Sequence, residues 1–197
     1  SKIKVDQIQT GDGTGTIALQ NQLSGMTTAS LPALGSAQMP TGSVLQVVQG
    51  ILTEPFASTT ADTWLDVVTV NITPSSTSSK IYVSFNINAM VISDNQRAGA
   101  RIARDSTGIG TASSVGLRTA AATTFAGTSD GTLSQINTSN SILDTPSTTS
   151  QITYRLQVQC ENTTEIKVNI DDADGNGDSY FRGVSTITAM EIPGWLI

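Results

Sequence analysis

The side chains in this sequence that most resemble a metal site lie between residues 172 and 178. Oxygen-bearing side chains alternate there at Asp172, Asp174, Asn176 and Asp178, with a glycine before and after Asn176. This is the spacing of the first half of a calcium-binding loop, where the oxygens converge on the ion and a glycine permits the sharp turn. The twelfth position of such a loop is a bidentate glutamate, but here it is Gly183. A Ca²⁺ site and a β-hairpin turn both stay open, and we favour the turn because Asp, Asn and Gly tolerate positive φ.

Catalytic chemistry has few candidates in this chain. The sequence contains no histidine and a single cysteine, Cys160. These counts exclude a His-dependent triad, a His-ligated metal and an intrachain disulfide within one polypeptide. Cys160 ends an alternating apolar run, which predicts a small buried core residue. We therefore expect no catalytic residues and no enzyme activity.

Paired carboxylates are the one other feature that suggests catalysis, because glycosidases use two of them. None of the pairs lies in a recognisable motif, and solvated turn carboxylates are far more common. The candidates are Asp62 with Asp66, Asp94 with Asp105, and Glu161 with Glu165. A carbohydrate-degrading function is therefore the least favoured one.

Charge is sparse, with 13% charged residues and a formal net charge of −6. The ten basic residues are scattered, whereas phosphate binding needs clustered Lys and Arg, so nucleic acid is not an expected partner. One local basic run consists of Arg97, Arg101 and Arg104. It suits contact with an anionic glycan, but a solvated strand edge or a set of salt bridges between subunits is more common, and we favour that interpretation.

Alternating apolar and polar residues predict an all-β protein. The clearest strand spans residues 80–92, with the odd-numbered side chains from Ile81 to Val91 on one face. A second strict alternation spans 151–160, and further strands are expected at 44–51, 64–72, 100–104, 166–170 and 184–192. Between 105 and 149 we expect short strands joined by long loops. Turn signals recur roughly every ten residues, which predicts an antiparallel β-sandwich or jelly roll. Outward Asn, Thr and Ser without charge also fit strand faces packed against identical subunits.

The beginning of the chain carries two short alternating segments on either side of a Gly/Thr turn. Their apolar residues are Ile3, Val5, Ile8, Ile17 and Leu19. A hairpin of this size has too little apolar area to be stable alone, so it must dock on something else. Residues 1–24 are therefore predicted to be an anchoring or oligomerisation segment.

The next segment, residues 25–43, is uncharged, and Pro32 and Pro40 discourage helix there. It predicts a linker or extended arm, and residues 44–197 then form the β-sandwich domain. No hydrophobic stretch approaches the ~20 residues that span a membrane, and no signal peptide begins at Ser1. We expect synthesis in a cytoplasm and no membrane insertion.

Several segments, in the same order, resemble fibre-like virion structural proteins of tailed bacteriophages, especially those of cyanobacteria. They are residues 1–8 (SKIKVDQI), 41–48 (TGSVLQVV), 71–83 (NITPSSTSSKIYV), 101–105 (RIARD) and 182–192 (RGVSTITAMEI). The resemblance implies a homotrimer whose N-terminal segment attaches to other virion proteins and whose C-terminal β-rich knob, residues 44–197, projects from the particle. This chain has no repetitive shaft between residues 25 and 43, which implies a short fibre or spike.

The expected function is thus that of a non-enzymatic virion component. Its knob would contact a glycan or protein of the host surface, with the loops of 105–149 as the contact surface. The alternative is a capsid decoration or cement protein. In that case the arm at 25–43 would stretch across neighbouring capsomers and stabilise the head shell.

Overall fold

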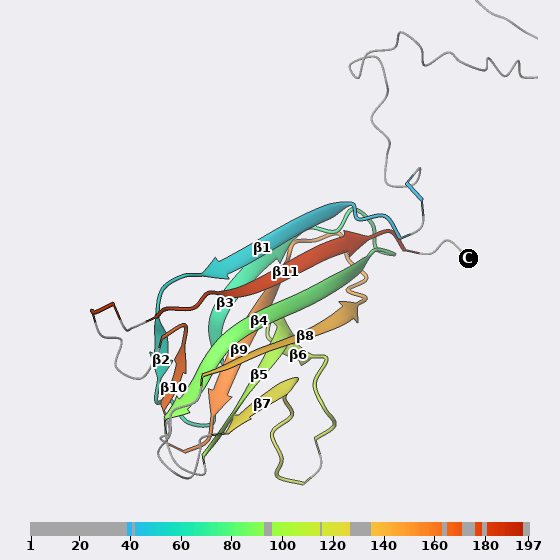
Figure 1. Ribbon diagram of the computed structural model, residues 1–197. Coiled ribbons are helices and arrows are strands. Elements are labelled where there is room, and N and C mark those ends of the chain that lie inside the picture. The colour runs from blue at the N-terminus through green and yellow to red at the C-terminus, as the bar shows by residue number, and fades with distance from the viewer. Residues whose placement is uncertain are drawn as a thin grey trace, which may run out of the picture. The chain divides into compact units, whose positions relative to one another are not determined.

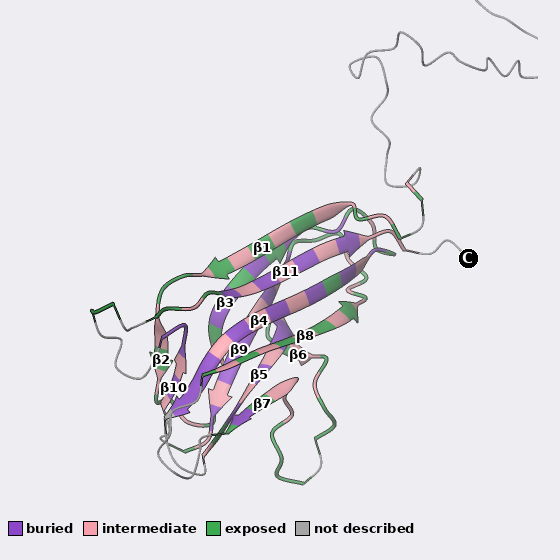
Figure 2. Ribbon diagram, viewed as in Figure 1, coloured by how far each residue is buried: buried purple, intermediate pink, exposed green. Residues whose placement is uncertain are grey.

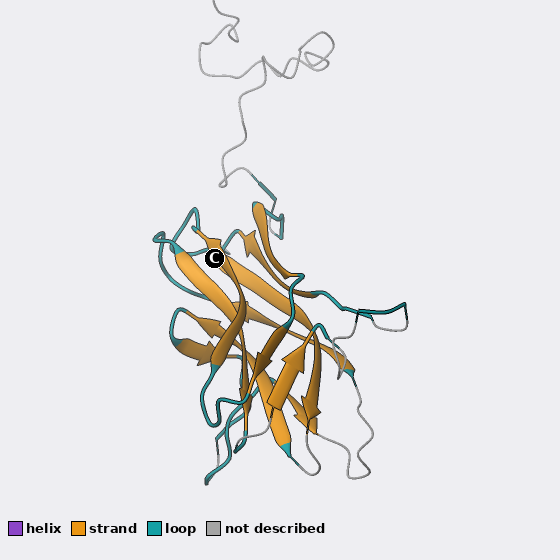
Figure 3. Ribbon diagram, turned by 90° about the vertical axis from the view of Figure 1, so that its left-hand side faces the viewer, coloured by secondary structure: helices purple, strands orange, loops and turns teal. Residues whose placement is uncertain are grey.

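The computed structural model describes residues 39–40, 42–92, 96–114, 116–126, 135–162, 165–170, 176–178 and 181–194, all within the unit Ser36–Ile197. These residues form strands and loops and contain no helix (Figure 3). It follows that the described part of the chain offers no apolar helix of membrane-spanning length. The predicted anchor, residues 1–24, lies outside the described residues, as does nearly all of the predicted linker.

Strands follow one another along the whole described length (Figure 1). Their bounds are β1 Gln46–Leu52, β2 Phe56–Ser58, β3 Leu65–Ile72, β4 Lys80–Ile92, β5 Arg97–Arg104, β6 Thr107–Ile109, β7 Thr123–Ala126, β8 Ile136–Asp144, β9 Ile152–Cys160, β10 Glu165–Val168 and β11 Ser185–Ile192.

The strands form two antiparallel sheets. In sheet A the order is β1-β11-β4-β8, and β10 continues beside the last residues of β4 with β2 on its other side. In sheet B the order is β3-β9-β5, and β6 and β7 pair with successive parts of β5. Apart from β5 and β7, which pair within sheet B, the main strands alternate along the chain between β1-β11-β4-β8 and β3-β9-β5-β7. This is the connectivity of a jelly roll. The predicted antiparallel sandwich is confirmed.

The two ends of the sandwich differ in what they carry. At the near end β1 begins and β11 ends, so the chain enters and leaves the sandwich on the same side (Figure 1). At the far end β1 ends, β5 begins and β9 ends. The chain therefore joins the sandwich at its near end, and the loops at the start of β5 and the end of β9 lie at the other end of the sandwich.

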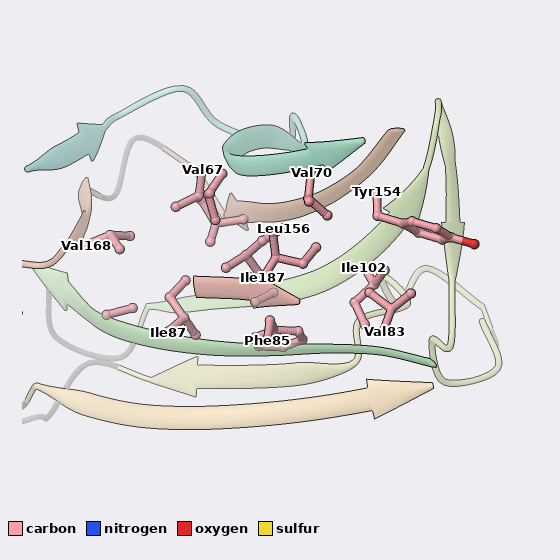
Figure 4. Close-up of a cluster of buried hydrophobic side chains, with 14 of the residues drawn as sticks. Val67, Val70, Val83, Phe85, Ile87, Ile102, Tyr154, Leu156, Val168 and Ile187 are labelled. Atoms are coloured by element: carbon pink, nitrogen blue, oxygen red, sulfur yellow. The ribbon is translucent and has the colours of Figure 1, made fainter. Parts of the chain in front are cut away.

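The core lies between the sheets and follows directly from the alternation in the sequence (Figures 2 and 4). In β4, the side chains of Ile81, Val83 and Ile87 are completely buried. They meet Tyr154 and Leu156 of β9, which are also completely buried. Burial of side chains of this size contributes about 1.5–3 kcal/mol each. The strand predicted at 80–92 is confirmed residue for residue, and so is the buried position of Cys160 in β9.

Several elements differ from the prediction. The strand β8 has nine residues where short strands and loops were expected, and β2 was not expected at all. Near the start of β3 the register with β9 shifts between Asp66 and Val68, so that Val67 and Val68 are both buried. Gln157 has the parity of an outward residue but is only 8% exposed. The alternation of apolar and polar residues does not predict a β-bulge or a buried residue on the outer face.

A buried polar cluster joins the residue after β10 to the start of β11 and the end of β1. Asn169 is completely buried and has a left-handed φ of 65°. Its amide donates to the carbonyl of Leu52 at 2.8 Å, and its Oδ1 accepts from the Ser185 hydroxyl at 2.6 Å. Because each of these buried groups has a partner, the cluster fixes the β10–β11 connection at little desolvation cost.

A buried carboxylate stabilises the near end. Glu191 of β11 is only 1% exposed. It accepts hydrogen bonds from the Gln46 amide at 2.6 Å, the Ser75 backbone N–H at 2.7 Å, and the hydroxyls of Ser75 and Ser79 at 2.6 Å each. The β3–β4 loop and β1 are therefore both bound to one side chain.

Candidate functional site on the outer face of sheet B

The residues proposed for calcium and for anchoring lie mainly outside the described part of the chain. Asp172 and Asp174 are outside it, and Asn176 and Asp178 are described and exposed. The described residues contain no group of three or more acidic or Cys side chains arranged to hold a metal. The calcium loop therefore stays a prediction. The anchoring residues Ile3, Val5, Ile8, Ile17 and Leu19 are also outside the described residues.

Among the carboxylates considered for hydrolysis, Asp66, Glu161 and Glu165 have structural partners, and Asp105 accepts from the Thr153 backbone N–H at 3.1 Å. Asp66 accepts from Arg155 and from the Gln157 amide. Glu161 pairs with Arg97 at 3.6 Å, and Glu165 lies 3.8 Å from Lys167. The partner of Asp105 in its pair, Asp94, lies outside the described residues. These contacts account for Asp66, Glu161 and Glu165 as parts of the sheet surface.

The three arginines all lie on β5, which is an inner strand of sheet B with β9 on one side and β6 and β7 on the other. Arg97 pairs with Glu161, the Arg101 Nε donates to the Gln157 Oε1 at 2.9 Å, and Arg104 donates to both Asp144 oxygens at 3.0 Å. The expectation of a strand edge is therefore wrong, because β5 has neighbours on both sides. Each of the three side chains has a partner within the chain, and salt bridges between subunits stay a prediction.

One of these arginines joins the two sheets. Asp144 ends β8 of sheet A, and Arg104 ends β5 of sheet B. Asp144 also accepts a hydrogen bond of 2.6 Å from the hydroxyl of Tyr154, which is completely buried. Burial first, and then this hydrogen bond with the carboxylate, raises the pKa of Tyr154 far above its ordinary value, so the phenol stays protonated. The cluster holds the near end of the sandwich together.

The other two arginines shape the outer face of sheet B. Arg101 places its guanidinium 4.2 Å from the centre of the Trp64 ring, which is a cation–π contact. Gln157 connects Arg101 to Asp66, because its carbonyl accepts from Arg101 and its amide donates to Asp66 at 2.8 Å. This chain of contacts crosses from β5 over β9 to β3, so the orientation of the Trp64 ring is fixed by residues on three strands.

Beside Trp64 lies a cavity of about 490 Å³ at the far end of sheet B. Gly99 and Gln159 form part of its floor, the Arg97–Glu161 pair lies at its border, and residues 117–121 form a wall. A Cβ atom on Gly99 would lie 2.9 Å from the Ala121 Cβ, so glycine lets the wall pack closely on β5. Leu117 on the wall is fully exposed. We call this cavity the Trp64 pocket.

The Trp64 pocket contains an unpaired acceptor. The Oε1 atom of Gln159 is buried and has no hydrogen-bond partner, although most buried polar atoms in proteins have one. Cys160 also borders the pocket, but its thiol contacts the Thr60 carbonyl at 3.4 Å, and burial raises its pKa, so it is a weak nucleophile. The lining of the pocket thus combines an ion pair, an aromatic residue and a glutamine whose buried acceptor is unpaired. These are the kinds of group that bind a hydroxyl-bearing ligand.

The sequence alone does not predict which residues line the Trp64 pocket. Its residues come from the segment before β3, from β5, from the segment 117–121, from β7 and from the end of β9, and they are separated by up to about a hundred positions. One sequence feature does point to it: Arg97, Gly99 and Arg101 are alternate residues of one strand, so they share its outer face. The prediction that the contact surface lies in 105–149 includes one wall of the pocket but none of its floor.

Comparisons with known proteins give a likeness in structure only. No protein-family model matches the sequence, and no curated protein matches it. Among solved structures, the chain is similar to a mutant VP2 protein of infectious bursal disease virus in T=1 particles, with 16% identity and a TM-score of 0.39. That match covers 83% of this chain and 41% of the VP2 chain.

A second similar structure is that of the Gx strain of infectious bursal disease virus, with 14% identity, a TM-score of 0.39, and coverage of 83% of this chain and 42% of that one. The chain therefore spans less than half the length of the structures it matches. At this level of identity and superposition the likeness has no bearing on function.

Proposed function

We propose that this protein is a non-enzymatic structural component of a bacteriophage particle, a short trimeric fibre or spike. Its N-terminal segment attaches to other virion proteins, and its knob contacts a glycan of the host surface through the Trp64 pocket. The observation that carries the proposal is the polarity of the sandwich. The chain enters at the near end, while the Trp64 pocket is at the far end.

The jelly-roll topology and the order of the sequence segments that resemble phage fibres support this assignment, although fold alone does not define function. The Trp64 pocket supports the ligand class. The unpaired Gln159 Oε1 would accept from a sugar hydroxyl once its side chain turns toward the pocket, and the Arg97–Glu161 pair can exchange hydrogen bonds with other hydroxyls. Contact at one pocket is weak, and three copies on one fibre would strengthen it by avidity.

Immunogold electron microscopy of intact particles, with antibody against residues 44–197, tests the virion assignment. We expect gold at the tail or neck. Gold spread over the head would replace the host-contact role with the capsid decoration or cement role, and loss of the protein should then lower the particle's resistance to heat. No gold on any part of the particle would contradict the virion assignment.

Competition for adsorption tests the Trp64 pocket. The purified full chain should block phage adsorption, and Leu117→Asp should weaken this block about tenfold or more, because it places a charge on the pocket wall without disturbing the core. The matched control is Thr69→Asp, an exposed position on β3 of the same sheet outside the pocket lining. Equal blocking by both variants would remove the Trp64 pocket from host contact.

A further inference from the structure

The outer face of sheet A differs in kind from that of sheet B. Outward side chains line up across β1, β11, β4 and β8 in three rows fixed by the strand register. The first row is Val47, Met190, Tyr82 and Leu143; the second is Gln49, Thr188, Ser84 and Ser141; the third is Ile51, Thr186, Asn86 and Ser139. We call these twelve residues the neutral face, because none of them carries a charge.

The first row of the neutral face is an apolar stripe that runs from one sheet edge to the other. Its two end residues, Val47 on β1 and Leu143 on β8, are 55% and 49% exposed. Tyr82, between them, is 36% exposed. A stripe of large apolar side chains in contact with water is the usual mark of an interaction surface.

The polar side chains of the neutral face and its border are bonded to one another across the strands. Asn86 and Asn137 exchange two amide hydrogen bonds of 3.0 Å, and Asn137 also donates to Asn88 at 2.8 Å. Gln49 donates to Thr188 at 2.9 Å. Polar groups that already have partners lose little when water is removed, so this face can be covered at a low desolvation cost.

The neutral face also has a shape that can accept another surface. A depression of about 460 Å³ lies over β4 and β8, lined by small side chains that include Ser84, Ser139 and Ser141. It borders the apolar stripe at Tyr82. A ridge of large side chains next to a hollow of small ones allows two such faces to interdigitate.

We infer that the neutral face is the surface through which copies of this chain pack on one another around a rotation axis. The chain has a net charge of −6, so copies repel wherever their acidic side chains meet, and the neutral face is free of that repulsion. It also has no charge to attract an anionic or cationic partner. Because the stripe joins both sheet edges, Leu143 of one copy can meet Val47 of the next and close the stripe into a ring.

This inference rests on the proposed trimer and names its contact surface. In a cyclic assembly the β8 side of each face meets the β1 side of its neighbour, which is a heterologous contact that closes after a fixed number of copies. The strands β1 and β8 are the two edges of the four-stranded part of sheet A.

Disulfide cross-linking of the full-length chain tests the contact. In the variant Val47→Cys/Leu143→Cys, mild oxidation should link the copies into dimers and closed trimers on a non-reducing gel. Native Cys160 is only 1% exposed and adds little background. The matched control is Thr69→Cys/Thr124→Cys, which places two exposed cysteines on opposite edges of sheet B. We expect about tenfold or more cross-linking relative to this control, because packed copies have a high effective concentration.

The outcomes separate the contact surface from the assembly. Native mass measurement should give three chains for the wild type and for Thr124→Lys, and one chain for Leu143→Lys, which puts a charge into the stripe. A trimer by mass without preferential cross-linking, or an intact trimer in Leu143→Lys, would overturn the neutral face as the contact while leaving the proposed fibre in place. A monomeric wild type would overturn both the contact and the trimer.

Discussion

Replacement of Glu191 by alanine is expected to lower the free energy of unfolding by about 3 kcal/mol at pH 7, because the donors that now converge on its carboxylate lose their acceptor. The hydroxyl of Ser79 donates to Glu191 at 2.6 Å, and Ser79 is only 1% exposed. Water therefore cannot replace the lost acceptor. Urea unfolding of the variant and the wild type gives the difference directly. An unchanged midpoint would mean that the near end is held by other contacts.

The same carboxylate predicts a pH dependence. Burial alone would raise the pKa of Glu191, but hydrogen bonds from Ser75, Ser79 and Gln46 favour the charged form more strongly, so the pKa is lowered below its ordinary value. Its contribution to stability is therefore fully present above the unfolded-state pKa of about 4.3 and is lost as the pH falls through the lower folded-state pKa.

The isosteric variant Glu191→Gln isolates this effect. Its stability deficit should be largest near pH 7 and should shrink as the pH falls below about 4.3, where the unfolded chain takes up the proton, until the folded carboxylate is also protonated at its lower pKa. The matched control is Glu165→Gln, whose surface pair with Lys167 is worth at most about 1 kcal/mol. A deficit that stays constant between pH 7 and pH 3 would show that the charge of Glu191 does not contribute.

The second large effect is expected at Gly50 in β1. A Cβ atom there would lie 2.3 Å from the Thr69 carbonyl oxygen and 3.0 Å from a Val68 methyl, both on β3 of the opposite sheet. Because the first obstacle is backbone, no rotamer change relieves it, and β1 must move away. Gly50→Ala should therefore cost about 3 kcal/mol, the upper end of overpacking effects.

Urea unfolding and hydrogen exchange of the β1 amides measure the Gly50→Ala effect. Exchange in β1 should accelerate before that in β9, because the displaced strand is at the edge of sheet A. The neighbouring variant Gln49→Ala removes only an exposed hydrogen bond to Thr188 and should change stability by less than about 0.5 kcal/mol. If Gly50→Ala were as stable as Gln49→Ala, the close approach of β1 to β3 would be wrong.

The sequence predicts those parts of the fold where one face of a strand is buried and the other is not. In β4 and β9 this condition holds at all outward positions except Met90 and Gln157, and both strands appear with the expected inward residues. It fails in β8, whose inward side chains include Thr138 and Asn140, because these reach hydrogen-bond partners on or before β7. A polar residue with a partner can replace an apolar one, and then the alternation disappears.

The candidate sites were less predictable because they depend on register between distant strands. The stripe of the neutral face joins Val47, Tyr82, Leu143 and Met190, which no local pattern connects. The burial of Glu191 can be predicted from the sequence. It follows Ile187 and Ala189 at the same alternation, and a charged residue at an inward position must be buried with hydrogen-bond donors. The alternation predicts uncharged outer strand faces. Which of their side chains are neighbours depends on the strand order, which the sequence does not predict.

The start of β1 and the end of β11 lie at the same end of the sandwich, and this has a mechanical consequence. A pull between the segment before β1 and a ligand held at the far end acts along the axis of β1. The seven residue pairs that join β1 to β11 lie across that direction. The hydrogen bonds of these seven pairs would be loaded in shear at the same time. They would not open one after another from one end of the strand. Such a strand gives way only when the whole ladder breaks, so this geometry would resist a tether under tension.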